Sequence, residues 1–192
     1  MPKLWTDTIE AHRREVRGAI LDTAAALVDE GGLLAVTMSQ IAEATGIGRA
    51  TLYKYFPDVE SILFAWHQDQ ISRHLEQLQK VAEQPGRARD RLEAVLEAFA
   101  LIKREARGRH GSALGSFFHG DEQVEHAEHR VQGLIGDLLA EAAADGDVRD
   151  DLPHGELASY CTNALGAARE LPSKVAVHRL VTLTLDGLRP SP

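Results

Sequence analysis

The chain has 192 residues, of which 44% are hydrophobic, and a formal net charge of −8, a composition typical of a globular protein with a sizeable core. Its single cysteine, Cys161, excludes an internal disulfide and a zinc site built from several cysteines. No apolar run reaches the roughly 20 residues of a membrane-spanning helix, and the first residues lack a secretory hydrophobic core. We therefore expect a soluble, cytoplasmic protein.

The spacing of apolar residues predicts helices along the whole chain, with no strand-like alternation. The expected helices span residues 9–30, 37–45, 49–56, 58–81, 87–107, 121–144, 154–169 and 173–188, with one more short helix in the glycine-rich segment 108–120. The sequence therefore predicts an all-α fold of about nine helices. Its first three helices would form a small domain, and the others a C-terminal helical bundle.

The second of these helices has a clear start. Thr37 or Ser39 can cap its first amides, and Gln40 stands at the position that completes a capping box with Thr37. We expect Ile41 and Ala44 to face inward. A threonine followed by a glycine then ends the helix after about two turns.

The third helix, residues 49–56, lies between Gly48 and Pro57. Helices of two turns are unstable alone, so this helix and the one before it must pack against their longer neighbours. The lengths of helix, turn and helix over residues 37–56 match a helix-turn-helix. Residues 46–56 hold two cations and no acid, although the chain as a whole is acidic.

The third helix should bury one side and expose the other. Inward positions would be Ile41, Ala42, Ile47, Leu52 and Phe56, and exposed positions Arg49, Thr51, Tyr53, Lys54 and Tyr55. Arginine and threonine side chains can read base edges in a major groove, whereas lysine and tyrosine suit phosphate oxygens. Of the two tyrosines, either Tyr53 packs inward and Tyr55 contacts phosphate, or the reverse.

Three further residues complete the predicted DNA contacts. Thr37 and Ser39, at a helix N-terminus, are placed to hold a phosphate. Gly48 lets the backbone approach DNA closely, or is only a turn residue.

The segment VTMSQIAEATGIGRATLYKYFPDVESIL, together with the preceding helix, resembles the N-terminal domain of the TetR/AcrR family of bacterial transcription regulators. The resemblance covers about residues 13–73 and is most specific at TLYKYFPDVESIL. It implies a DNA-binding domain over 13–73 and a ligand-binding and dimerisation domain over 74–192. It also implies a homodimeric, ligand-responsive regulator, most often a repressor, without enzymatic activity or cofactor.

By the same resemblance, helices 154–169 and 173–188 of each subunit form a four-helix dimer interface. The alternative is that they only cover the core of a monomer. In a dimer, two recognition helices about 34–36 Å apart read successive major grooves, which predicts a palindromic DNA operator.

The resemblance also places a pocket for a small-molecule effector among the helices from about 58 to 169. An aromatic residue at helical spacing is nevertheless more often core than ligand wall. The candidate lining residues are Trp66, Phe99, Phe117, Phe118 and Tyr160, with His67, His74 and Asn163 as polar anchors.

A histidine and carboxylate cluster near residues 119–129 offers another interpretation. His119, His126 and His129 lie near Glu122 and Glu125, so a metal site, or an enzyme that uses it, is one hypothesis. A solvated, charged helix start explains the same residues, and we therefore predict no metal site. A DNA-binding regulator without any effector is the remaining alternative.

Overall fold

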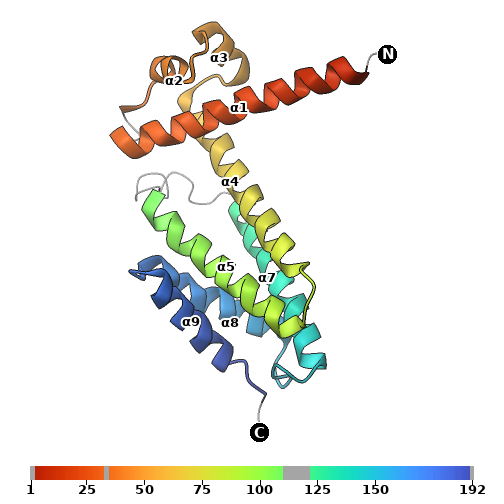
Figure 1. Cartoon of the computed structure of the whole chain (residues 1–192). Helices are drawn as coiled ribbons and strands as arrows, with labels where there is room; N and C mark the ends of the chain where they lie inside the picture. The colour runs from red at the N-terminus through yellow and green to blue at the C-terminus, as the bar shows by residue number, and fades with distance from the viewer. Residues whose placement is uncertain (1–2, 33–34, 110–121, 191–192) are drawn as a thin grey trace. The chain divides into compact units, whose positions relative to one another are not determined.

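The computed structural model describes residues 3–32, 35–109 and 122–190, and every regular element in these ranges is helical (Figure 1). The elements are α1 (Lys3–Gly31), α2 (Met38–Thr45), α3 (Arg49–Tyr55), α4 (Val59–Ala82), α5 (Ala88–Arg109), α7 (Glu122–Ala144), α8 (His154–Gly166), the 3-10 helix η2 (Ala167–Glu170) and α9 (Lys174–Asp186). The predicted all-α fold is confirmed. The short helix predicted in segment 108–120 falls almost entirely outside the described residues.

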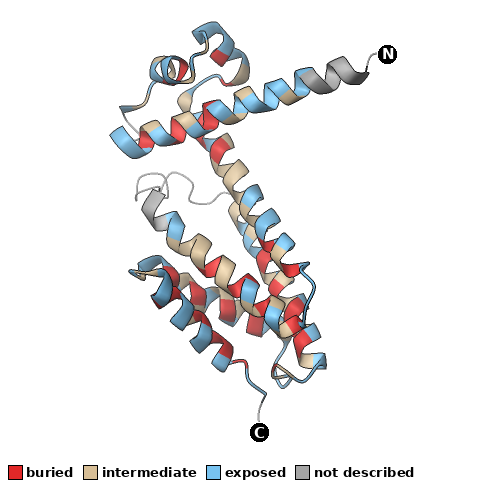
Figure 2. Ribbon diagram, viewed as in Figure 1, coloured by how far each residue is buried: buried red, intermediate tan, exposed pale blue. Residues whose placement is uncertain are grey.

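The chain divides into two compact units, and the boundary lies inside α4, between Gln70 and Ile71. Unit 1 holds α1, α2, α3 and the first half of α4, and unit 2 holds the second half of α4 and the helices from α5 to α9. Each unit has its own cluster of buried hydrophobic side chains (Figure 2). The boundary predicted after residue 73 lies close to this division.

Unit 1 is built on α1, which packs against α2, while α2 packs against α3. Its core is formed by the buried side chains Ile20, Leu21, Ala24, Ala25, Val28, Ile41, Ala42, Leu52, Phe56, Ile62, Leu63 and Trp66. The two-turn helices α2 and α3 are thus held between α1 and the start of α4, as their short lengths require.

One inward position in α2 was predicted wrongly. Ala44 is exposed, and Ala42 is buried beside Ile41. Met38 and Thr45 are half-buried on the same side of the helix, so the buried face is centred between Ile41 and Ala42. Ala44 lies about a third of a turn away from that centre and therefore meets solvent.

Unit 2 is organised around α5, which packs against α7, α8, η2 and α9. The loop that follows α7 is fixed by polar contacts: Arg87 donates to both carboxylate oxygens of Asp147 at 2.9 and 2.7 Å, and the Arg149 amide donates to the Leu188 carbonyl at 2.9 Å. The residues predicted as one helix over 154–169 form α8 and then the tighter helix η2.

Burial affects two ionisable side chains of unit 2, those of the fully buried Cys161 and the half-buried Lys103. Cys161 is fully buried, and burial raises the pKa of its thiol to about 12, so the neutral thiol acts as a small hydrophobic side chain. The Lys103 ammonium lies 3.7 Å from a carboxylate oxygen of Glu128 and 5.1 Å from the centre of the Phe99 ring. Desolvation, and then the nearby Arg169, lower the pKa of Lys103. Within the described ranges, no helix has both the length and the apolar character needed to cross a membrane.

Candidate nucleic-acid interface

The N-terminus of α2 is closed by the predicted capping box. The Gln40 amide donates to the Thr37 hydroxyl at 3.3 Å, and the Thr37 amide donates to the Gln40 side-chain oxygen at 2.9 Å. The Thr37 hydroxyl also donates to that oxygen, at 2.8 Å. Because these two side chains satisfy each other, the remaining unbonded amides at this helix end are those of the first turn, which include Ser39.

The turn between α2 and α3 depends on a left-handed glycine. Gly46 has φ 72° and ψ 16°, and its amide closes α2 by donating to the carbonyls of Ala42 and Glu43. The Ile47 amide donates to the same Ala42 carbonyl at 3.1 Å. A side chain is disfavoured at this φ, so the glycine is needed for the turn that sets the direction of α3.

Gly48 serves a different purpose. Its φ of −66° and ψ of 143° suit any residue, and a Cβ added there would meet only the Thr51 hydroxyl, at an ordinary 3.9 Å. Its carbonyl starts α3 by accepting from the amides of Thr51 at 2.8 Å and Leu52 at 3.0 Å. The fold therefore does not require a glycine at this position, and the role predicted for Gly48 in close approach of DNA stays a prediction.

Helix α3 is anchored by Leu52, which is fully buried, and by Phe56, which caps its C-terminus. Arg49, Thr51 and Lys54 are exposed, as predicted. Tyr53 is 56% exposed, whereas Tyr55 is half-buried and packs against the core of unit 1. The prediction that both tyrosines are exposed is therefore wrong for Tyr55, because it lies next to Phe56 on the side that faces the core.

The exposed side of α3 is locally cationic. Between Glu43 and Asp58 the sequence contains Arg49 and Lys54 and no acid. Asp58 itself caps α4 by accepting from the Ser61 amide at 2.7 Å, and this hydrogen bond lowers the pKa of its carboxyl group. The face thus offers two cations and two hydroxyl side chains, the combination that binds phosphates and base edges.

A cationic group on α1 that the sequence interpretation left aside also reaches this region. The Arg17 guanidinium lies over the Phe56 ring, with its central carbon 5.5 Å from the ring centre. It therefore stands beside the C-terminal end of α3. The position of Arg17 could have been predicted from the sequence, because it precedes Ile20 by three residues and so lies on the same side of the helix.

The predicted effector-site residues do not form one group in the structure. Trp66 lies in the core of unit 1, and Phe99 lies in the core of unit 2. His67 and His74 are half-buried on α4. Tyr160 and Asn163 are exposed on one side of α8, where the Asn163 side-chain amide donates to the Ser159 carbonyl at 2.8 Å. Phe117 and Phe118 fall outside the described residues, so the effector site remains a prediction.

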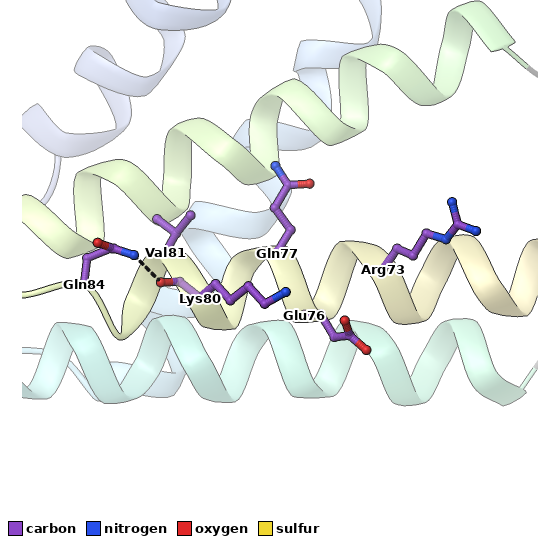
Figure 3. Close-up of a pocket in the computed structure, with 6 residues that line it drawn as sticks. All are labelled: Arg73, Glu76, Gln77, Lys80, Val81 and Gln84. Atoms are coloured by element: carbon purple, nitrogen blue, oxygen red, sulfur yellow. Dashed lines mark hydrogen bonds between the residues drawn. The ribbon is translucent and has the colours of Figure 1, made fainter. Parts of the chain in front are cut away.

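A shallow hollow follows the second half of α4 (Figure 3). It is lined by Arg73, Glu76, Gln77, Lys80, Val81 and Gln84. Five of the six come from this one helix, and Gln84 follows its end, where its side-chain amide donates to the Lys80 carbonyl at 3.2 Å. None of the predicted effector-site residues lines it, and one helix cannot enclose a ligand.

The histidines predicted near residues 119–129 are exposed where the structure describes them. His126 and His129 lie on α7, and Nδ1 of His129 is 2.8 Å from the Glu125 carbonyl oxygen. In the described part of the chain, no three His, Cys, Asp or Glu side chains are grouped closely enough to hold a metal ion. His119 falls outside that part.

Two family models match the chain. The model of the tetR family of bacterial regulatory proteins matches residues 20–65, and the model of the C-terminal domain of SbtR-like transcriptional regulators matches residues 96–190. The HTH-type transcriptional repressor KstR of Mycolicibacterium smegmatis is 25% identical over 142 residues, 74% of this chain and 70% of that protein. The fatty acid metabolism regulator protein of Bacillus subtilis is 26% identical over 141 residues, 69% of this chain and 71% of that protein.

Solved structures share the fold. A TetR/AcrR-family transcriptional regulator of Thermobifida fusca has a TM-score of 0.75 at 22% identity, over 90% of this chain and 98% of that one. The ketosteroid transcriptional regulator KstR2 of Mycobacterium tuberculosis has a TM-score of 0.64 at 18% identity, over 91% of this chain and 95% of that one. The family resemblance seen in residues 13–73 is confirmed.

The two turn glycines should respond differently to alanine. Gly46→Ala should lower the free energy of unfolding by about 1–2 kcal/mol, because the new Cβ is strained at positive φ. Gly48→Ala should leave it unchanged or raise it by up to about 1 kcal/mol, because alanine restricts the unfolded chain. Urea denaturation followed by circular dichroism measures both variants. If both variants lost the same amount of unfolding free energy, the conformational role assigned to Gly46 would be contradicted.

Proposed function

Because the chain belongs to the TetR family of bacterial regulatory proteins and is a DNA-binding transcription regulator, we propose that it is a homodimeric repressor acting in the cytoplasm. It would bind a palindromic operator through α3 and release it when a small molecule occupies unit 2. The observation that carries the proposal is the exposed, cationic side of α3, held in place by the buried Leu52.

In this proposal each exposed residue of the helix-turn-helix has a role. Arg49 and Thr51, near the start of α3, read base edges in the major groove. Lys54 and Tyr53 contact phosphates, and the half-buried Tyr55 supports the helix from the core side.

One residue outside α3 completes these contacts, and one glycine makes room for them. At the start of α2, the Ser39 amide is not used by the capping box and would bind a phosphate, whereas the Thr37 amide already donates to the Gln40 side chain. Gly48 lets the DNA backbone approach the start of α3, since its own conformation needs no glycine.

Dimerisation through α8 and α9 is supported by apolar surface on these two helices. Tyr160 is 45% exposed, Val175 66% and Leu183 65%. Helices α8 and α9 pack against each other, and a Cβ added to Gly187 would lie 2.8 Å from the Tyr160 hydroxyl oxygen. Gly187 follows Leu183 by one helical turn, so Tyr160 and Leu183 belong to one surface that a second subunit would cover.

The effector would act through α4, which contributes side chains to both cores. Trp66 belongs to the core of unit 1 and Leu78 to the core of unit 2. A ligand that prefers a form of unit 2 in which α4 is shifted must weaken operator binding, because the two equilibria are linked. The names of two similar proteins refer to fatty acid metabolism and to ketosteroids, so these compounds are the first to test.

Two alternatives to an effector-responsive repressor remain. One is a regulator whose activity depends only on its own abundance, and the effector experiment decides between the two. The other is an enzyme that uses the 119–129 cluster. The similar proteins are named as regulators, and the exposed positions of His126 and His129 do not set them apart from solvated surface histidines. We therefore propose that the chain is not an enzyme.

The assignment of α3 is tested on the operator recovered by selection from genomic DNA. Arg49→Ala should cost about 1–3 kcal/mol on this operator and much less on a scrambled duplex, because it removes base contacts. Lys54→Ala should weaken binding to both duplexes and reduce the slope of log K against log salt by about 1.8, which is about 0.9 for each subunit of the dimer. Fluorescence anisotropy at several salt concentrations measures both effects.

The matched control is Arg130→Ala, which removes an exposed cation from α7 and should leave DNA binding unchanged. If Arg49→Ala loses the same binding free energy on the operator and on the scrambled duplex, Arg49 contacts a phosphate and not a base. Full binding by both α3 variants would rule out α3 as the recognition helix.

The dimer interface is tested with Leu183→Glu, which places a charge on the apolar surface of α8 and α9. The variant should sediment as a monomer and lose most operator affinity, because two half-sites are no longer bound together. Ala94→Glu adds the same charge at an exposed position of α5, outside the apolar surface of α8 and α9, and should remain dimeric. A dimer in both variants would contradict this interface.

The effector is tested by thermal unfolding with fatty acids and ketosteroids. A true effector present at about 100 times its Kd should stabilise the protein by roughly 2.7 kcal/mol and should release the operator. By linkage, the operator should weaken effector binding by the same factor. If no compound raises the Tm and none releases DNA, the alternative of a regulator without an effector is favoured.

A further inference from the structure

We infer that the first half of α1 forms a second DNA-binding surface, on which Arg13, Arg14 and Arg17 bind phosphates beside the site read by α3. This inference rests on the proposed function, because α3 must place the DNA. The three arginines precede residues 20–65, the part that the tetR family model matches.

The arginines share one face of α1 with its core residues. Ile20 and Leu21 are fully buried against the rest of unit 1. Arg17 precedes them by three and four positions, and Arg13 and Arg14 precede Arg17 by four and three, which places all five on the same side of the helix. The face that packs against the helix-turn-helix therefore continues toward the N-terminus as an arginine surface.

This surface extends past the end of the core and beside α3. Figure 1 shows α1 continuing toward the N-terminus beyond its packing with α2 and α3. Arg17 marks the edge of the core, since its guanidinium lies 5.5 Å from the centre of the Phe56 ring at the C-terminal cap of α3. Arg13 lies about 6 Å further along the helix axis, toward the N-terminus.

The arginines are available for a partner. All three are exposed, and none forms an ion pair within the described part of the chain. Glu10 is the one described carboxylate on this face, which leaves the surface with an excess of cations. Glu15 lies on the other side of the helix, where its carboxylate is 3.9 Å from the His12 ring nitrogen.

Double-stranded DNA fits this surface better than a protein partner does. The contacts offered are guanidinium groups, which bind phosphate oxygens with two parallel hydrogen bonds. Arg17 is separated from α3 by one aromatic side chain, so a duplex held in its groove by α3 would bring neighbouring phosphates toward Arg17 and the two arginines that precede it. Such contacts add affinity without reading sequence, and they lengthen the duplex that the protein covers.

The test compares the full-length protein with Arg13→Ala/Arg14→Ala. Arg17 is left intact because it also packs on Phe56. Because a dimer carries both substitutions in each subunit, the double variant should reduce the slope of log K against log salt by about 3.6 and the affinity by roughly 1,000-fold at 0.15 M salt, on the selected operator and on a scrambled duplex alike. Wild-type protein should also bind more tightly when the operator is extended by about five base pairs at each end, and the double variant should not.

Lys80→Ala/Arg130→Ala is the matched control, since it removes two exposed cations from unit 2 and the same net charge. Glu10→Gln removes the carboxylate from the arginine face and should therefore tighten DNA binding. Because the expected change is a gain in affinity, this second readout cannot be mimicked by a variant that folds poorly. If wild-type protein binds its operator but the double variant keeps the same slope and affinity, the inference is wrong and the proposed function stands. If wild-type protein binds no DNA at all, the proposed function fails first.

Discussion

The presentation of the DNA-facing side chains depends on the burial of Leu52. Helices α2 and α3 have eight and seven residues, too few to persist alone in water. Their stability comes from tertiary packing, and Leu52 is the fully buried side chain through which α3 joins the core of unit 1. Because every residue proposed to contact bases lies within three positions of Leu52, its contact with the core also fixes their positions.

Local contacts at the helix ends fix the orientation of α3, which Leu52 attaches to the core. The Thr37 capping box fixes where α2 begins, and the left-handed Gly46 fixes where it ends. Gly48 then starts α3 with an extended backbone two residues later. Arg17 closes the other end by covering the Phe56 ring. The angle of the recognition helix is therefore set by a few short-range contacts around one buried leucine, and α1 contributes to both the core and the exposed face.

Features that depend on near neighbours in the chain could be predicted from the sequence. The Thr37 capping box and the Gly46 turn belong to this class, as do the ends of α3, because each is fixed by residues a few positions apart. The inward positions were less predictable. Ala44 and Tyr55 each lie at the border of a buried face, and the centre of such a face is set by neighbouring helices rather than by the sequence of the helix itself.

The predicted effector site shows a different limit. Aromatic residues were selected by type, yet Trp66 and Phe99 belong to two separate cores. Both are buried because large apolar side chains gain most from leaving water, which applies to a core and to a ligand pocket alike. Residue type therefore cannot separate the two, and only three-dimensional packing shows which core each side chain enters.

The net negative charge of the protein does not prevent it from binding DNA, because salt screens the repulsion between DNA and distant acidic residues. At physiological ionic strength, exposed charges further apart than about 8 Å hardly interact. With the contacts proposed above, DNA at α3 would interact mainly with Arg49, Lys54 and the α1 arginines, whatever the total charge. The acidic excess after residue 56, where 22 acids face 15 Lys and Arg residues, keeps the rest of the surface from attracting DNA without regard to sequence. Because a genome offers a vast number of non-specific sites, a cationic surface confined to unit 1 favours the operator over all of them.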